Sequence, residues 1–277
     1  MSEETPVIPS PPGRFLDAAA VLPALAGEGW RGTLRETIES VLGVKRARAI
    51  FEAAAEASNP ADALLAGFGL EIDAGNTLES LPAEGPAVIV SNHPFGGADA
   101  ISQIALGLRR RSDYLILANE VAASAPGIGP FCLPLSILGG RDAARRNALT
   151  LKAALDHLRG GGLLGVFPAG EVSTWRPHRG EIADGPWSPH IASLAVKASA
   201  PVLPLRFFGA NPPWFHLGGG LHPMVRTVLL PRVILAARGR TVTCRAGEWI
   251  SPEELAALPV ETRTAFLRKQ LEAVPFP

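Results

Sequence analysis

Short apolar segments alternate with amphipathic segments along most of this sequence, and this alternation limits its fold more than any other feature. Four apolar runs have the length and composition of buried strands: 88–90, 114–117, 163–167 and 202–208. Three segments between them space their apolar residues as helices do: 98–109, 143–159 and 189–199. Strands that alternate with helices are typical of α/β domains. We therefore predict an α/β fold with a mixed, largely parallel sheet flanked by helices.

The N-terminal third precedes this alternation and is expected to have two parts. Residues 1–13 are acidic and then rich in proline, and we expect a disordered leader there. Apolar residues recur at helical spacing between Leu34 and Leu42, and a second helical segment lies near 50–66. We therefore predict a helical lead-in over residues 14–80, followed by the α/β domain at 81–277.

The C-terminal segment has the residues that mark helix starts. Residues 242–245 alternate between apolar and polar side chains, which predicts one more strand. Ser251 is followed by Pro252, and Glu254 stands three positions after the serine, which is the pattern of a capped helix start. We predict a terminal helix over 255–271.

Composition excludes several classes of protein. Among 277 residues, 47% are hydrophobic and 19% charged, so the chain can bury a large core. Lys and Arg total 26 and so do Asp and Glu, so the broad basic surface of a nucleic-acid-binding protein is not expected. Cys132 and Cys244 lie far apart in apolar surroundings, which indicates reduced core residues rather than disulfides or metal ligands.

Membrane insertion and export are also not expected. The first residues lack the basic and apolar regions of a signal peptide. The most apolar long stretch, 114–140, is interrupted by Asn119, Glu120 and three prolines, so it does not supply the roughly 20 apolar residues that a bilayer-spanning helix needs. Any membrane contact should be peripheral, and the best candidates are the segments 34–42 and 214–230.

The segment from Asn92 to Asp99 has the clearest chemical signal. His93 follows an apolar strand, and Asp99 lies in the first turn of the next helix. Open α/β sheets build their sites at the carboxyl ends of strands, so His93 is a candidate general base and Asp99 its orienting partner. Gly96 and Gly97 allow a tight loop between them. The alternatives are that His93 is an ordinary loop residue and that the helix dipole alone favours Asp99.

A second apolar run also ends in a turn that is followed by polar residues. The run that ends at Phe167 breaks at Pro168 and Gly170 into polar residues that begin with Glu171. Two such strand ends can face one crevice. A third apolar run ends just before Arg141, which could hold a phosphate or carboxylate or could simply be solvated. Arg145 and Arg146 are better explained as a solvated helix face.

Three sequence blocks together resemble those of the glycerolipid and lysophospholipid acyltransferase superfamily in order and spacing. The blocks are Asn92-His93 with Asp99, Phe167 to Ser173, and Ala200 to Pro204. The likeness covers residues 80 to 250, and 81–277 would be the acyltransferase domain. Within the superfamily, 92–99 and 221–227 resemble the hemolysin-like and lyso-ornithine-lipid acyltransferase branch.

The resemblance implies transfer of an acyl chain from acyl-CoA or acyl carrier protein to a hydroxyl of a lysolipid, without a metal or other cofactor. His93 would be the base, with Asp99 beside it. The chain would then act in the cytoplasm, peripherally at the inner face of the cell membrane. The expected substrate-binding residues are Asn92, Gly96, Gly97, Arg141, Phe167, Pro168, Gly170 and Glu171.

The sequence departs from the family pattern at two points. His93 and Asp99 enclose five residues, where most members have four. Ala169 precedes Gly170 and Glu171 follows it, where the usual block has Glu before the glycine and Thr after it. The acceptor therefore need not be a glycerol phosphate. No Gly-x-Ser-x-Gly motif is present, which favours direct attack by the acceptor. A hydrolase that uses the same base, or a non-catalytic lipid-binding protein, remains an alternative.

Overall fold

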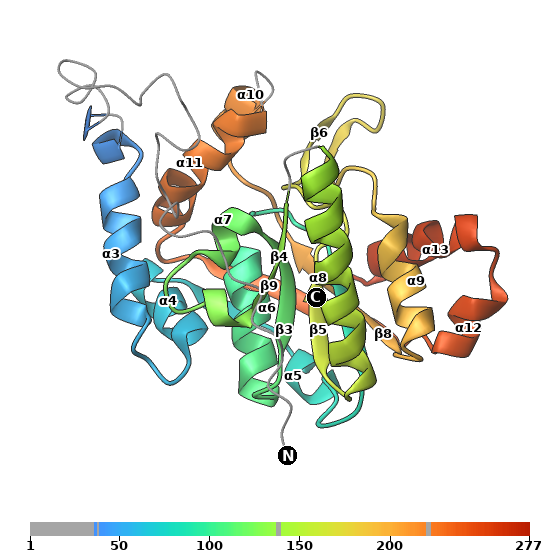
Figure 1. The fold of residues 1–277 in the computed structure, drawn as a ribbon. Helices are drawn as coiled ribbons and strands as arrows, with labels where there is room; N and C mark the ends of the chain where they lie inside the picture. Colours follow the sequence, from blue (N-terminus) through green and yellow to red (C-terminus); the bar gives the residue numbers. More distant parts are fainter. Residues whose placement is uncertain (1–35, 38, 137–139, 220–222) are drawn as a thin grey trace.

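The computed structural model describes residues 36–37, 39–136, 140–219 and 223–277, and Figure 1 draws the rest as a thin trace. The leader predicted at 1–13, the start of the lead-in, and Leu221 and His222 of the family-like segment lie outside the described residues. Within the described residues, no helix is long and apolar enough to cross a membrane.

A seven-stranded sheet forms the centre of the described structure, in the order β1-β9-β8-β2-β5-β3-β4. Its strands are β1 (Glu71–Asp73), β2 (Ala87–Ser91), β3 (Leu115–Asn119), β4 (Cys132–Leu135), β5 (Leu163–Val166), β8 (Val202–Phe208) and β9 (Thr241–Ala246). All neighbouring strands run parallel except β8 and β9. The predicted mixed, largely parallel sheet is confirmed.

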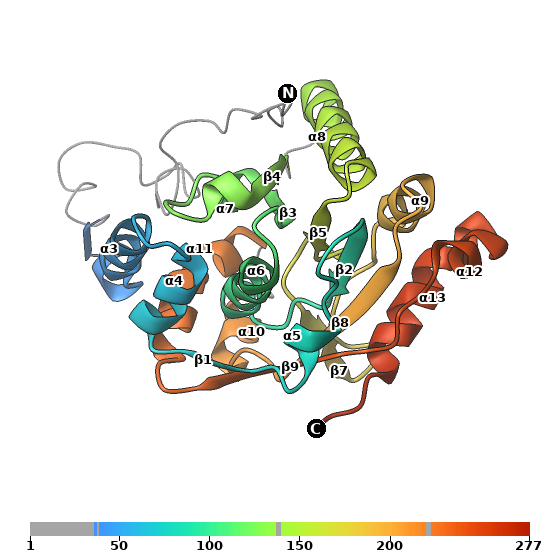
Figure 2. The same ribbon diagram turned by 90° about the horizontal axis from the view of Figure 1, so that it is seen from below.

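Helices cover both faces of this sheet (Figure 2). On one face lie α3 (Val44–Ala54), α4 (Pro60–Phe68) and α6 (Ala98–Arg110). On the other lie α8 (Arg141–Arg159), α9 (Pro189–Lys197), α12 (Pro252–Ala257) and α13 (Val260–Ala273). Strand β2 is buried on both sides, because Ile89 joins the first hydrophobic cluster whereas Val88 and Val90 join the second.

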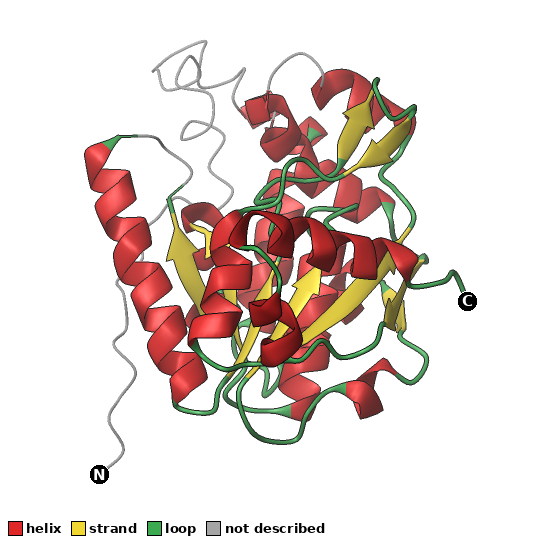
Figure 3. Ribbon diagram, turned by 90° about the vertical axis from the view of Figure 1, so that its right-hand side faces the viewer, coloured by secondary structure: helices red, strands yellow, loops and turns green. Residues whose placement is uncertain are grey.

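Smaller elements complete the fold. They are α5 (Thr77–Ser80), α7 (Glu120–Ala123), a 3-10 turn at Gly129–Phe131, α10 (Pro213–Gly219) and α11 (Pro223–Ala236). A separate antiparallel hairpin consists of β6 (Thr174–Arg176) and β7 (Glu181–Ala183). Figure 3 shows this hairpin above the main sheet, beyond the ends of its strands.

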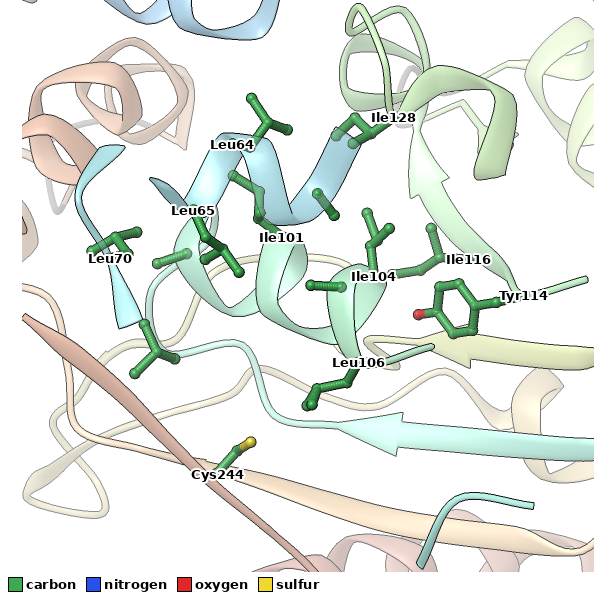
Figure 4. Packing of buried hydrophobic residues seen from close by; sticks show 14 of the residues in the cluster. Leu64, Leu65, Leu70, Ile101, Ile104, Leu106, Tyr114, Ile116, Ile128 and Cys244 are labelled. Atoms are coloured by element: carbon green, nitrogen blue, oxygen red, sulfur yellow. The ribbon is translucent and has the colours of Figure 1, made fainter. Parts of the chain in front are cut away.

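Two glycines make room for a buried aromatic ring in the first cluster. Tyr114 is fully buried between α6 and β5 (Figure 4). A Cβ atom at Gly107 would overlap the tyrosine ring, and one at Gly165 would overlap its hydroxyl. Close packing of Tyr114 therefore requires glycine at both positions. The tyrosine hydroxyl has no hydrogen-bond partner among the described residues.

The sequence predictions are confirmed for the central strands and their helices and are wrong in three places. Segment 14–80 is not wholly helical, because β1 pairs with β9 at the sheet edge. The apolar stretch 114–140 contains a second strand, β4, with a proline inside it. The terminal helix is two helices, because the chain turns extended at Leu258 before Pro259. Ser251 caps α12 as predicted, accepting the Glu254 N–H at 3.0 Å.

Candidate active site

His93 lies just beyond the carboxyl end of β2, between strands β5 and β8. Its Nδ1 is 3.2 Å from Oδ2 of Asp99, which lies in the first turn of α6. The Asp99 side chain is fully buried and that of His93 is 14% exposed. This distance is within ion-pair range, and the two groups form an ion pair when the imidazole is protonated. The structure therefore brings the predicted pair together, with Nδ1 of His93 facing the carboxylate of Asp99.

The loop between His93 and Asp99 folds over the carboxylate. Oδ2 of Asp99 accepts the N–H groups of Phe95 at 2.8 Å and of Gly96 at 3.3 Å. Gly96 has a φ of 79°, and a Cβ atom there would be 2.6 Å from Val172. Glycine at this position therefore permits both the turn and the close approach of the second motif. Gly97 precedes the first residue of α6.

The ring of Phe167 stacks on the ring of His93. Their centroids are 4.1 Å apart and their planes differ by 28°. Phe167 follows β5, which pairs with β2, so the two predicted strand ends do meet. The ring of Phe167 restricts how the imidazole can turn and covers one of its faces.

Two carboxylates act on the ionisation of His93. Burial disfavours the imidazolium and lowers the pKa of His93. The charge of Asp99 and its contact with the ring raise this pKa, and the charge of Asp184 raises it further. The net result is a pKa above the ordinary histidine value.

Asn92 ties the end of β2 to the neighbouring strand β8. Its side-chain amide donates to the carbonyl oxygen of Phe207 and accepts the Phe207 N–H, both at 2.8 Å. Phe207 belongs to β8, so the amide continues the β2–β8 ladder just past the last paired residue, Ser91. These two bonds anchor the backbone just before His93 to β8, and the predicted contact of Asn92 with substrate stays a prediction.

The residues after β5 form a polar loop close to His93. Pro168 is buried and its carbonyl accepts the Ser188 N–H, whereas Gly170 is exposed with a φ of 64°. Glu171 forms an ion pair with Arg176, with 2.6 Å between Oε1 and Nη2. A Cβ atom at Gly185 would overlap Glu171, so the pair packs directly against the backbone beside Asp184.

Arg141 lies on the expected edge of the sheet but not next to His93. It is the exposed first residue of α8, after β4. Strands β5 and β3 stand between β2 and β4. Three strand spacings amount to about 14 Å, so Arg141 could contact only a distant part of a long substrate.

The sequence gives no signal for Asp184, a buried carboxylate whose partners include His93. Its Oδ1 accepts the backbone N–H of His93 at 3.1 Å and the hydroxyl of Ser173 at 2.5 Å. Its Oδ2 accepts the indole N–H of Trp187 at 2.9 Å. Asp184 stands 91 positions from His93, and no motif spacing connects the two.

Comparison with known proteins agrees with this geometry. Residues 76–207, which contain β2, β5 and most of β8, match the family model described as Acyltransferase. This match and the relatives below support a likeness of residues 76–207 to the glycerolipid acyltransferase superfamily. The match contains all three sequence blocks on which the resemblance was based and supports that resemblance over residues 76–207.

Two curated acyltransferases align with half of this chain. Lyso-glycine lipid O-acyltransferase of Phocaeicola vulgatus is 30% identical over 140 residues, which are 50% of this chain and 48% of that protein. The protein of the same name from Bacteroides thetaiotaomicron is 29% identical over 140 residues, covering 50% and 49%. The chain thus spans about half the length of the curated relatives that it matches.

One solved structure is also similar to this chain. It is the 1-acyl-sn-glycerophosphate (LPA) acyltransferase PlsC from Thermotoga maritima, with 17% identity and a TM-score of 0.49. The comparison covers 92% of this chain and 86% of that chain.

Proposed function

We propose that this protein transfers a fatty acyl chain from an acyl thioester to a hydroxyl group of a lysolipid. The observation that carries the proposal is the 3.2 Å contact between Nδ1 of His93 and Oδ2 of Asp99 at the end of β2. A histidine whose Nδ1 faces a buried carboxylate has its Nε2 available to take a proton. Acyl transfer to a hydroxyl requires such a base.

The proposed reaction needs no covalent acyl-enzyme. His93 takes the proton of the acceptor hydroxyl while the acceptor oxygen attacks the thioester carbonyl carbon. The resulting tetrahedral intermediate collapses, the carbon–sulfur bond breaks, and the imidazolium returns its proton to the thiolate. Asp99 stabilises the imidazolium between these steps, because its charge favours the protonated ring. The products are an ester and the free thiol of coenzyme A or of acyl carrier protein.

Lysolipids with an amino-acid headgroup are the first acceptors to test. Both curated relatives are named for a lyso-glycine lipid. The ion pair of Glu171 and Arg176 offers a carboxylate and a guanidinium close to the catalytic histidine. A headgroup carboxylate could bind the guanidinium, and a headgroup amine could bind Glu171. Lyso-ornithine lipid and lysophospholipid are the comparison acceptors.

The same proposal places the protein at a membrane surface. Trp175 on β6 is 54% exposed and Trp214 on α10 is 40% exposed. Helix α10 packs beside β6, beyond the sheet edge at which His93 lies. The guanidinium of Arg232 lies 5.9 Å from the ring centre of Trp214, which adds a cation suited to lipid headgroups. Exposed tryptophan next to arginine is typical of an interfacial surface.

The decisive experiment measures products rather than loss of donor. Purified protein is incubated with each lysolipid and with labelled acyl-CoA or acyl carrier protein, and the diacylated product is identified by mass. Ester formation with at least one lysolipid is expected. Thioester loss that is equal with and without any acceptor would instead identify a hydrolase, and no thioester loss would identify a binding protein.

Two histidine variants provide the matched control. His93→Ala should lose acyl transfer, whereas His190→Ala alters an exposed histidine of α9 and should keep full activity. Full transfer by a folded His93→Ala protein would contradict the proposed mechanism.

A further inference from the structure

Asp184 is a buried aspartate whose carboxylate accepts three hydrogen bonds from residues around His93. The residue is 7% exposed and lies just after β7. Its carboxylate accepts three donors, which come from three different parts of the site: the His93 backbone, the Ser173 hydroxyl and the Trp187 indole. A carboxylate held by several donors on different segments is fixed in position.

The backbone of His93 is held by two hydrogen bonds, and Asp184 accepts one of them. On one side, the carboxylate binds the backbone N–H of His93 at 3.1 Å. On the other side, the carbonyl oxygen of His93 accepts the N–H of Ser173 at 2.8 Å. Ser173 is itself bound to Asp184 through its hydroxyl. The backbone at His93 is therefore held by the segment that follows β5 as well as by β2.

We propose that Asp184 is a second positioning carboxylate for His93, which fixes the backbone of the base and stabilises its protonated form during acyl transfer. The inference rests on the proposed function, in which His93 is protonated in the intermediate. Asp99 contacts the imidazole, whereas Asp184 contacts the backbone of the same residue, so the two carboxylates act on His93 from different directions.

Other charged groups near this carboxylate are already paired with other atoms. Arg268 of α13 donates to the carbonyl oxygens of Asp184 and Gly185 and to the carboxylate of Glu272. Arg176 pairs with Glu171. The three groups that the structure shows on the Asp184 carboxylate are neutral donors, so its negative charge is not cancelled by an ion pair among them.

The neutral donors provide variants that separate charge from packing. Asp184→Asn removes the charge with little change of shape. Ser173→Ala and Trp187→Phe each remove one neutral hydrogen bond and leave the charge in place. If Asp184 served packing alone, all three variants would lower thermal stability without changing the ionisation of His93.

The test is an NMR titration of His93 in protein labelled at histidine, together with pH profiles of kcat/KM. Asp184→Asn should lower the pKa of His93, move the acidic limb of the profile to lower pH, and reduce kcat about 10- to 100-fold with little change in KM. Ser173→Ala and Trp187→Phe should leave the His93 titration unchanged. An unchanged His93 titration in folded Asp184→Asn would overturn the proposal.

A second variant covers the case in which Asp184→Asn does not fold. Asp184→Glu keeps the charge but displaces the carboxylate, so it should keep the raised pKa of His93 and still lose kcat. Full kcat in Asp184→Glu would equally overturn a positioning role. The titration needs no turnover, so it decides the role of Asp184 even if no lysolipid proves to be a substrate.

Discussion

Phe167 stacks its ring 4.1 Å from the imidazole of His93, so an apolar side chain just after β5 lies against the proposed base just after β2. The stack leaves the imidazole few orientations other than the one in which Nδ1 faces Asp99. We expect Phe167→Ala to lower kcat about tenfold or more, because a loosened base is less often in reactive geometry. Phe167→Tyr should keep the stack and most of the activity, and steady-state kinetics of both variants checks this.

Asp99→Asn should reduce kcat by about two to four orders of magnitude. The amide cannot stabilise the imidazolium, and it can hold the ring in the wrong tautomer. The loss should appear in kcat more than in the KM of either substrate, in single-turnover and steady-state assays. Thermal unfolding is the control, because Asp99 also holds the loop at Phe95 and Gly96. Normal kcat in folded Asp99→Asn would rule out a catalytic role for the pair of His93 and Asp99.

The pH dependence of activity should be set by the raised pKa of His93. A base must be deprotonated to act, so the acidic limb of kcat/KM should lie above the ordinary histidine value of about 6.5. Asp99→Asn should move the limb to lower pH, because it removes the main charge that favours the imidazolium. An acidic limb of kcat/KM that lies at or below the ordinary histidine pKa in the unaltered protein would contradict this expectation.

Stability should have the matching dependence on pH. The folded state binds the His93 proton more tightly than the unfolded state does, so protonation stabilises the fold. This contribution is complete below the unfolded pKa and is lost as the pH rises through the folded pKa. Urea unfolding of wild type and His93→Gln should therefore differ more at acidic pH than at alkaline pH, once the pH-independent difference is subtracted.

Glu171 and Arg141 should affect the acceptor more than the donor. Glu171→Gln breaks the ion pair with Arg176 close to the base, so the KM for the lysolipid should rise while that for the thioester stays constant. Arg141→Ala should have a smaller effect, because β5 and β3 separate its strand from β2. Unchanged acceptor kinetics in both variants would make these residues structural.

Binding to vesicles should depend on Trp175 and Trp214. The double variant Trp175→Ala and Trp214→Ala should float less with vesicles of phosphatidylethanolamine and phosphatidylglycerol. Trp249→Ala is the matched control, because Trp249 is 38% exposed but lies beside Ile250, which bridges to the first residue of β8 at the opposite edge of the sheet. Equal flotation of all variants would exclude the two tryptophans as the contact.

The packing of Tyr114 can be tested separately from the site. Its buried hydroxyl has no hydrogen-bond partner among the described residues, so Tyr114→Phe should stabilise the protein by about 1 kcal/mol. Gly165→Ala should destabilise it by several times that amount, because the new methyl group overlaps the hydroxyl. Chemical unfolding of both single variants and the double variant would show partial rescue.

Local patterns in the sequence predicted the centre of the fold but not its periphery. Buried strands such as β2 have apolar runs bounded by polar residues, and these carry the signal within a few positions. The three residues of β1 form a strand only because β9 pairs with them, so no local window identifies it. Strand β4 was not among the predicted strands, and it carries its proline at the edge of the sheet, where proline is tolerated.

The candidate site also combines residues that local patterns identify with residues that only the fold brings together. His93 and Asp99 are close in sequence, so a short loop brings them together, and Phe167 reaches them because β5 pairs with β2. Asp184 lies just after β7, and it reaches His93 because the chain after β5 folds back over the end of β2. The bonds between the Asn92 amide and Phe207, 115 positions away, likewise follow from the pairing of β2 with β8 and not from a local pattern.

The pairing of β1 with β9 has a consequence for the newly made chain. Glu71 lies opposite Thr241, 170 positions later, and β9 also pairs with β8 on its other side. Until the ribosome has released residues 241–246, β1 has no partner in the sheet and β8 presents an open hydrogen-bonding edge. Open edges of this kind pair readily with other chains. Protection of nascent chains by a holding chaperone should therefore matter most during the interval before β9 emerges.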